Sequence, residues 1–462
     1  MDILYIGCLV TMSAPINTPT QHEERIFALD VVRGFAILGI LIMNIQSFSM
    51  IEATYLNPTA YGDFTGLNRW IWIFSHLLAD QKFITIFSLL FGAGIVLFTG
   101  RIEAKGHSSL GLHYRRTFWL LVIGLLHSYL FWSGDILVTY ALCAMVMVLY
   151  RKWPPILLLI VGSLVFTVAS LLYLFLGFSL PHIPREAYEE IKLGWQSSPE
   201  LIERELTTYR SSWLDQMPLR VAASFRFQIF GFLIYEFWRV SGLMLIGMAL
   251  FKWGIFTAER SRRFYILLAV VGLGVGFPIV VYGIVQNFAA NWTVDYSMFL
   301  GSQFNYWASL LVSLGYCGVI VLVVKTSQLR PIANMLSAVG QMALTNYLLQ
   351  TIISTTLFYG HGLGLYGQVE RSGQILIVIG IWTVQLIISP LWLRYYRFGP
   401  AEWLWRSLTY WQIQAFREVY PAMPTADMLS AISEVEDEHT ILDEWNQVDV
   451  GNQLRAGIPF KS

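Results

Sequence analysis

Residues 25–49 read RIFALDVVRGFAILGILIMNIQSFS, an apolar segment long enough to cross a bilayer that also holds charged and polar side chains. Asp30 and Arg33 lie one turn apart, and Asn44 follows Arg33 by eleven residues, which is three helical turns plus roughly 20°. All three side chains therefore lie near one face of the predicted helix. An ionisable group at such depth costs on the order of 3 kcal/mol and usually faces a bundle interior or an aqueous cavity. The pattern predicts a helix that does more than anchor the chain.

The composition is that of a membrane protein. Hydrophobic residues make up 56% of the chain and charged residues 13%, against about 25% charged in soluble domains. The formal net charge is zero, which argues against a nucleic-acid partner. The three cysteines are far apart and predict neither a disulfide framework nor a metal site. We therefore predict an all-α integral membrane protein.

Ten apolar runs predict a polytopic bundle of about ten transmembrane helices. A Trp-rich segment, 66–81, predicts an interfacial or re-entrant helix, or else an extension of the next span. The predicted spans are 29–49, 83–100, 116–133, 135–150, 154–178, 227–251, 264–287, 298–324, 334–358 and 374–393.

Loop charges predict the orientation. Lysine and arginine cluster in alternate loops, after the second, fourth, sixth, eighth and tenth spans, which places both termini of a multi-pass membrane protein in the cytoplasm. The net acidic loop 180–225 is expected to form an amphipathic extracytoplasmic cap. Residues 1–24 are expected to be an N-terminal extension, 25–410 the membrane domain and 411–462 a polar, acidic cytoplasmic tail.

Further polar groups lie in or beside the predicted spans. Asp80 and Lys82 flank the outer end of the second span, as a binding pair or as a simple interfacial ion pair. On the ninth span, Asn346 is a candidate binding residue, and interhelical hydrogen bonding is the plainer interpretation. Tyr140 lies one to two turns into the fourth span, where a short preceding turn allows it to face His127 on the third.

His127 is the candidate base, because its ring exchanges a proton near neutral pH. Asp135 lies eight residues on, at a predicted tight extracytoplasmic turn. It can orient the His127 ring or cap the following helix. An anionic ligand that arrives from the cytoplasm would meet Arg33 first, and the His127 region lies in the outer half of the bundle.

Several stretches together resemble the YeiB-like bacterial inner-membrane family, whose C-terminal half is a domain of unknown function. They are RIFALDVVRGFAILGILIMNI, KFITIFSLLFGAGI, RRTFWLLVIGLLHSYLFWSGDILVTYAL, GQMALTNYLLQTIISTTLFYGHGLGLYG and QLIISPLWLRYYRFGPAEWLWRSLTY. The resemblance covers residues 25–410 and implies the same polytopic helical fold.

The pattern D-x-x-R-G-x-A of residues 30–36, followed by a polar residue eleven positions past the arginine, has a more distant similarity. It resembles the heparan-α-glucosaminide N-acetyltransferases and the bacterial acyltransferases that O-acetylate envelope sugars. The polar position is typically histidine in the second group and is Asn44 here, as in the first. This departure leaves His127 as the candidate base.

The resemblance implies a transmembrane acyltransferase that moves an acyl group from cytoplasmic acyl-CoA to an acceptor in the envelope. Arg33 would contact the donor, Asn44 would polarise its carbonyl, and His127 oriented by Asp135 would act as base. The remaining candidate binding residues are Asp30, Asp80, Lys82, Tyr140 and Asn346. No tightly bound cofactor is expected, with acetyl-CoA or another acyl-CoA as co-substrate and the lipid bilayer as partner.

Two alternatives use the same residues. A solute or metabolite transporter would use the polar stripe as a path, and an assembly protein would use it only for helix packing. Small-residue pairs such as Gly92 and Gly94 allow close helix contacts within or between subunits, so the oligomeric state is open.

Overall fold

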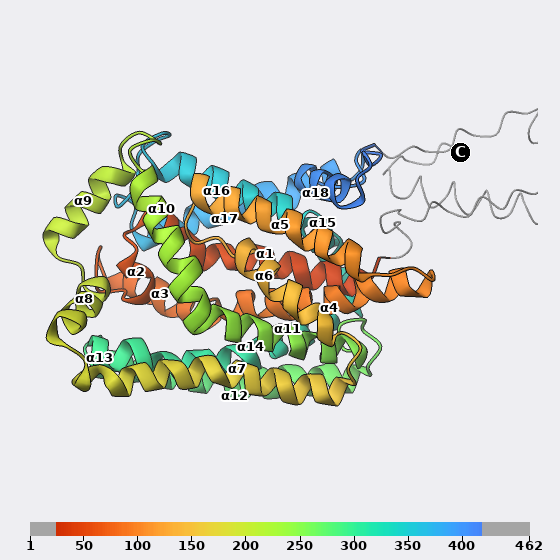
Figure 1. Cartoon of the computed structure of the whole chain (residues 1–462), viewed down its shortest axis with the longest axis horizontal. Helices are drawn as coiled ribbons and strands as arrows, with labels where there is room; N and C mark the ends of the chain where they lie inside the picture. The colour runs from red at the N-terminus through yellow and green to blue at the C-terminus, as the bar shows by residue number, and fades with distance from the viewer. Residues whose placement is uncertain (1–24, 418–462) are drawn as a thin grey trace, which may run out of the picture. The chain divides into compact units, whose positions relative to one another are not determined.

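The computed structural model describes residues 25–417, which form helices and connecting turns without a β-strand (Figure 1). This confirms the predicted all-α fold. The predicted extension 1–24 and all but the first residues of the predicted tail lie outside the described residues.

The helices follow one another along the chain as α1 Phe27–Ser49, α2 Ala53–Leu56, α3 Gly66–Leu78, α4 Lys82–Ala104, α5 Leu110–Leu130, α6 Leu137–Met147, α7 Pro155–Ser179, α8 Arg185–Trp195, α9 Pro199–Tyr209, α10 Met217–Arg226, α11 Phe237–Lys252, α12 Arg262–Ala289, α13 Val294–Tyr296, α14 Ser302–Val324, α15 Arg330–Gln341, α16 Ala343–Phe358, α17 Arg371–Trp392 and α18 Pro400–Tyr410. Two π-helical segments, Phe227–Glu236 and Ser297–Gly301, lead into α11 and α14. Short 3₁₀ turns occupy Val148–Tyr150, Leu180–His182 and Ser327–Leu329.

Seven helical runs of the described chain are long and apolar enough to cross a membrane. They cover seven of the ten predicted spans: Phe27–Ser49, Gly66–Ala104, Pro155–His182, Met217–Lys252, Arg262–Ala289, Val294–Val324 and Arg371–Trp392. The multi-pass helical architecture is therefore confirmed, and the count of ten stays a prediction.

The other three predicted spans are not among these seven runs, and each has a physical reason. Helix α5 carries two arginines and two histidines, which lower its mean hydropathy. The apolar run Leu137–Tyr150 is only 14 residues, or about 21 Å at 1.5 Å per residue. The span predicted at 334–358 is not one helix, because it breaks at Met342 into α15 and α16.

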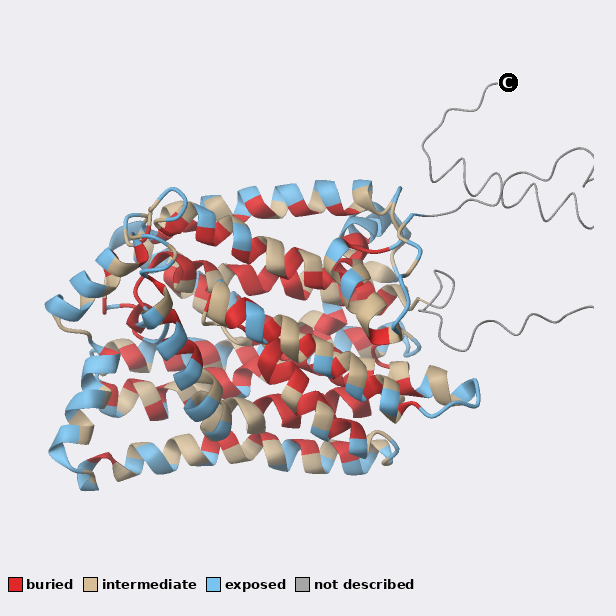
Figure 2. Ribbon diagram, turned by 45° about the horizontal axis from the view of Figure 1, so that its top comes forward, coloured by how far each residue is buried: buried red, intermediate tan, exposed pale blue. Residues whose placement is uncertain are grey.

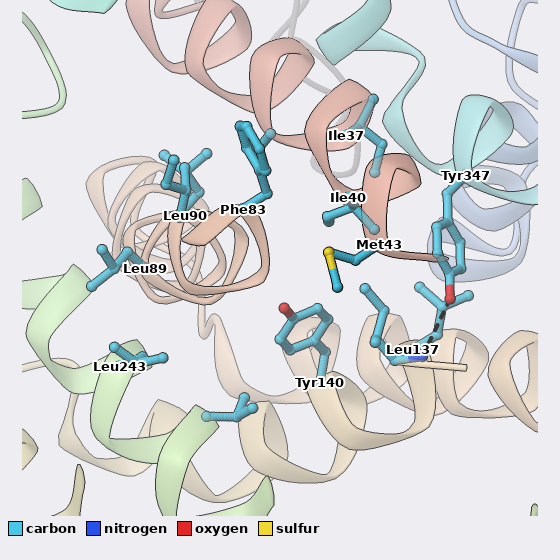
Figure 3. Packing of buried hydrophobic residues seen from close by; sticks show 14 of the residues in the cluster. Ile37, Ile40, Met43, Phe83, Leu89, Leu90, Leu137, Tyr140, Leu243 and Tyr347 are labelled. Atoms are coloured by element: carbon cyan, nitrogen blue, oxygen red, sulfur yellow. Dashed lines mark hydrogen bonds between the residues drawn. The ribbon is translucent and has the colours of Figure 1, made fainter. Parts of the chain in front are cut away.

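Helix α1 lies in the core of the bundle, against α4, α14, α15, α16 and α17. The closest approach is to α15, where a Cβ added to Gly34 would collide with the Leu336 carbonyl and one added to Gly340 with the Asp30 carbonyl. Further along α1 from this crossing, Ile37, Ile40 and Met43 pack with side chains of α4, α6 and α16 (Figure 3). Two glycines thus fix α15 against the turn of α1 that carries Asp30 and Arg33.

The outer helices α7, α12 and α17 bury less than a third of their apolar windows within the protein. Figure 2 shows buried residues concentrated in the middle of the bundle and exposed residues along its outer helices. Apolar side chains such as Leu267, Val270 and Leu376 are more than half exposed. Such surfaces are expected to face lipid.

The Trp-rich segment forms a helix of its own, α3, which ends at Leu78. A turn through Gln81, in the left-handed conformation at φ 63°, separates it from α4. The backbone separates α3 from α4, while the two helices together make up the one apolar run Gly66–Ala104. The placement of α3 at the membrane interface stays a prediction.

Loops predicted on one side of the membrane lie together. Arg151 pairs with Glu103 at 2.8 Å, which joins the last turn of α4 to the turn after α6. Arg25 and Tyr410 line the same cavity, so both ends of the described helical bundle lie at this end. The predicted cap forms α8 and α9 at the opposite end, where Glu205 accepts hydrogen bonds from the Glu52 backbone N–H and the Tyr366 hydroxyl.

Candidate functional site

A cavity of about 240 Å³ lies between α1, α4, α5, α16 and α18. Five arginines from these helices and from the segment just before α1 line it: Arg25, Arg33, Arg101, Arg116 and Arg406. Deeper in the bundle the walls are apolar and include Phe91, together with Ile37, Leu90 and Leu137, which Figure 3 labels. The cavity thus combines a cationic end with an apolar end, which suits an anionic molecule that carries an acyl group.

Asp30 partly neutralises the cationic end. Its Oδ1 accepts a hydrogen bond from Arg33 Nη1 at 2.8 Å, and its Oδ2 lies 3.6 Å from Arg25 Nη1. Asp30 is buried, whereas the Arg33 side chain is 29% exposed and reaches the cavity. Burial lowers the pKa of Arg406 to about 10, which still leaves it protonated at neutral pH. The structure therefore brings Asp30 and Arg33 together, as predicted, and adds further arginines to them.

Glu402 of α18 is the second acid in the cavity wall, and it holds the start of α16. Its Oε1 accepts hydrogen bonds from the backbone N–H groups of Leu344 at 2.6 Å and Thr345 at 3.0 Å. Its Oε2 accepts from the Thr345 hydroxyl. The first N–H groups of a helix have no partner within the helix, so this carboxylate stabilises the break at Met342.

His127 and Asp135 form a buried pair beyond the apolar end of the cavity, which neither residue lines. His127 Nδ1 lies 2.7 Å from Asp135 Oδ1, and the two residues are 4% and 1% exposed. Asp135 Oδ2 accepts from the Val138 backbone N–H at 2.9 Å, so the residue also caps α6. Both predicted roles of Asp135, orienting the ring and capping the helix, are therefore fulfilled by its two oxygens.

Asp135 is buried at the predicted turn between α5 and α6. Gly124, six residues before the end of α5, packs against Leu137 and Val138 at the start of α6. The residues between the helices therefore fold back against α5, so the predicted turn is present, and its side of the membrane stays a prediction.

The third member of the cluster is Thr351, which the sequence analysis did not select. Its Oγ1 lies 3.0 Å from His127 Nε2. Because a carboxylate only accepts hydrogen bonds, His127 Nδ1 carries a proton, and in the neutral ring Nε2 then accepts from the Thr351 hydroxyl. The ring is thus held with a basic nitrogen toward a hydroxyl group.

Tyr347 connects the cavity with this cluster. It lines the cavity, and its ring lies 5.3 Å from the His127 ring. Its hydroxyl accepts from the Ile136 backbone N–H at 3.3 Å, the contact drawn in Figure 3. The arginine-lined cavity and the His127 cluster are therefore neighbours, separated by the Tyr347 side chain and the start of α6.

Comparison with known proteins identifies the family. The family described as "Protein of unknown function (DUF418)" matches residues 250–412. The YeiB protein of Escherichia coli (strain K12) is 33% identical over 396 residues, which cover 84% of this chain and 96% of that protein. The chain belongs to the YeiB-like DUF418 family. The YxaH protein of Bacillus subtilis (strain 168) is also 33% identical, over 85% of this chain and 97% of its own. No solved structure matches.

In this DUF418 protein, Asp80 and Lys82 belong to a separate polar cluster. Lys82 is fully buried, and its Nζ donates to the His76 carbonyl at 2.7 Å and to Asn305 Oδ1. Asn305 Nδ2 in turn donates to Asp80 Oδ2 at 2.7 Å. The two charges are bridged through Asn305 instead of pairing directly, and neither residue lines the cavity. These bonds join α3, α4 and α14.

Tyr140 does not face His127. Its hydroxyl donates to the Ile84 carbonyl at 3.2 Å and lies 3.0 Å from Ser88 Oγ, so it joins α6 to α4. The expected Tyr140–His127 pairing is wrong, because Tyr347 occupies the place beside the His127 ring.

Asn346 and Asn44 also lie away from the cavity. Asn346 Nδ2 donates to the Val339 carbonyl at 3.1 Å and to Ser389 Oγ at 3.1 Å, which adds a side-chain donor at the helix break. This matches the interhelical alternative. Asn44 is half-buried on α1, within the described chain it has no hydrogen bond, and its role at an acyl carbonyl stays a prediction.

Proposed function

We propose that this DUF418 protein is a membrane acyltransferase that binds an acyl thioester, such as an acyl-CoA, in the arginine-lined cavity. The observation that carries the proposal is the continuity of the site. One cavity has arginines at one end and, at the other, Tyr347 and Ile136, which adjoin the His127–Asp135 pair. A donor with a phosphorylated end and an acyl end matches this order of chemistry.

The charges support an anionic ligand. Arginine side chains bind phosphate groups through several N–H donors in a fixed plane. Of the two arginines beside Asp30, Arg33 has the more exposed side chain, and it lines the cavity. The volume of about 240 Å³ is below the range of roughly 300–1,000 Å³ that encloses whole drug-sized ligands. The acyl-thioester arm would therefore lie inside, with the nucleotide at the cationic mouth.

His127 supports the transfer step. With its proton on Nδ1, held by Asp135, its Nε2 can take a proton from an attacking hydroxyl and return it to the leaving thiolate. Asp135 keeps the ring in this tautomer, as the acidic member of a hydrolase triad does. The acceptor is proposed to be a hydroxyl or amine of the cell envelope.

The distribution of charged loops and the source of the relatives support a location of the protein in the cytoplasmic membrane of a bacterium, with the cavity toward the cytoplasm. The cationic loops gather at the cavity end, as in the positive-inside rule, and the curated relatives are bacterial. The lipid bilayer and a cytoplasmic pool of acyl-CoA would then be the partners.

The test is acyl transfer by the protein in membrane vesicles supplied with radiolabelled acetyl-CoA. We expect His127→Ala to abolish thiol release and label transfer while the protein still inserts and elutes as wild type does. His361→Ala is the matched control, because His361 is exposed in the loop after α16. Turnover at the wild-type rate in His127→Ala would contradict the role of this residue.

A transporter remains the second candidate because α15 and α16 form a broken helix beside the cavity. Broken helices whose half-helix ends meet a cavity are typical of transporter binding sites. Here, however, Glu402 already binds the N–H groups at the N-terminal end of α16. Solute flux through proteoliposomes that persists in His127→Ala would favour transport over transfer.

A further inference from the structure

Thr351 differs from the other threonines around it on α16. The hydroxyls of Thr355 and Thr356 donate to the carbonyls one turn earlier, at 2.9 and 2.7 Å. This back-bonding is the usual state of threonine in a helix. Thr351 Oγ1 lies 3.5 Å from the corresponding carbonyl of Tyr347, and 3.0 Å from His127 Nε2. Its hydroxyl is therefore directed to the histidine.

The resulting order is hydroxyl, imidazole, carboxylate. Thr351 Oγ1, His127 and Asp135 are linked at 3.0 and 2.7 Å, and Thr351 is 1% exposed. A nucleophile bonded to a base, with the base oriented by a third group, is the arrangement of enzymes that form covalent intermediates. The three residues come from α5, the start of α6 and α16, so the fold brings them together.

Thr351 does not line the cavity and lies one helical turn beyond its inner end. Tyr347, at the inner end of the cavity, precedes it by one turn on α16, which is about 6 Å along the axis. Ile136, another lining residue, is the neighbour of Asp135 in the chain. An acyl group whose donor is held by the arginines would enter the bundle toward this hydroxyl.

We propose that Thr351 is the nucleophile of a two-step transfer and carries the acyl group as an ester between donor and acceptor. This inference rests on the proposed acyltransferase function. It assigns a catalytic role to a residue outside the His127–Asp135 pair, and it predicts a covalent acyl-protein that a direct transfer would not form.

The steps balance as follows. Thr351 Oγ attacks the thioester carbonyl carbon while its proton passes to His127 Nε2. The carbon–sulfur bond breaks, and the thiolate leaves as a thiol with that proton. An acceptor hydroxyl then gives its proton to Nε2 and attacks the Thr351 ester. The carbon–oxygen bond to Thr351 breaks, and Oγ takes the proton back.

The test incubates the purified full chain with acetyl-CoA and no acceptor, followed by an acid quench, intact-mass analysis and peptide mapping. We expect wild type to release about one thiol per protein in a rapid first phase and to gain one acetyl group on the peptide that holds Thr351. Thr351→Val should lose both signals, and Thr351→Ser should keep them because it keeps the hydroxyl. Thr355→Val, the matched control one turn away, should behave as wild type.

Two results would overturn the inference in distinguishable ways. If Thr351→Val releases thiol as fast as wild type, or the acetyl group maps elsewhere, the Thr351 ester is wrong while acyl transfer stands. If wild type neither binds acetyl-CoA in a thermal-shift titration nor releases thiol, the proposed function itself fails. If Thr351→Val does not fold, wild type and Thr351→Ser decide the question. The inference is overturned if both proteins fold and wild type releases thiol, but neither protein gains an acetyl group.

Discussion

The proton position on the His127 ring depends on one atom of Asp135. Oδ1 accepts from the ring while Oδ2 accepts from the Val138 N–H. In Asp135→Asn the amide oxygen would keep the cap, because asparagine caps helices as well as aspartate does. Its NH₂ group would then face His127 Nδ1 and donate to it, which moves the ring proton to Nε2.

We therefore predict that Asp135→Asn retains most of the stability but lowers thiol release by about 10⁴-fold, the loss seen when a triad tautomer is reversed. The measurements are a thermal melt and acetyl-CoA turnover of the same preparation. Turnover within about tenfold of wild type would show that the tautomer held by Asp135 is not used in catalysis.

The sequence predicts part of this residue-scale picture. Eight residues across a short turn bring His127 and Asp135 together, and the helical repeat places Asp30 beside Arg33. Thr351 and Glu402 escape such reasoning because their partners lie 224 and 57–58 residues away. A threonine in an apolar helix gives no signal of its own until the fold directs its hydroxyl away from the backbone.

At the scale of elements, the crossing of α1 and α15 forms one wall of the cavity. Gly340 packs against the Asp30 carbonyl, a backbone atom that cannot move aside as a flexible side chain can. We predict that Gly340→Ala separates the two helices, destabilises the protein by about 1–3 kcal/mol or more and weakens acyl-CoA binding.

Gly380→Ala on α17 is the matched control, because a Cβ there meets no atom within 4 Å. It should leave the protein as stable as before or add up to about 1 kcal/mol through helix propensity. Thermal melts and acyl-CoA titrations of both variants decide the matter. Equal behaviour of the two alanine variants would contradict the packing role assigned to Gly340.

The sequence predicts α15 and α16 as a single span, and the break between them at Met342 has a cause outside the segment. No proline lies at the break, and the apolar run continues across it. The interruption is stabilised by side chains from elsewhere, Glu402 on the N–H groups of α16 and Asn346 on the Val339 carbonyl. Hydropathy therefore predicts that the segment lies in the membrane, and tertiary contacts determine its shape.

At the scale of the whole molecule, the sequence predicts fold class and family well. Low charge content and long apolar runs require a helical membrane protein, and the quoted stretches identify the YeiB-like family, as the comparisons confirm. The burial of Asp135 at the turn between α5 and α6 is not visible in hydropathy, because Asp135 and Gly134 read equally well as an exposed turn. Its consequence is a buried catalytic candidate.

The central claim is that the arginine-lined cavity binds an acyl-CoA, and a thermal-shift titration in detergent with acetyl-CoA and CoA tests it most directly. A ligand at about 100 times its Kd should stabilise the protein by about 2.7 kcal/mol. We predict a saturable shift that Arg33→Ala loses. Arg263→Ala should keep it, because Arg263 is exposed in the first turn of α12 and does not line the cavity. A wild-type protein that unfolds cooperatively without any shift, or an equal shift in Arg33→Ala, would contradict the account.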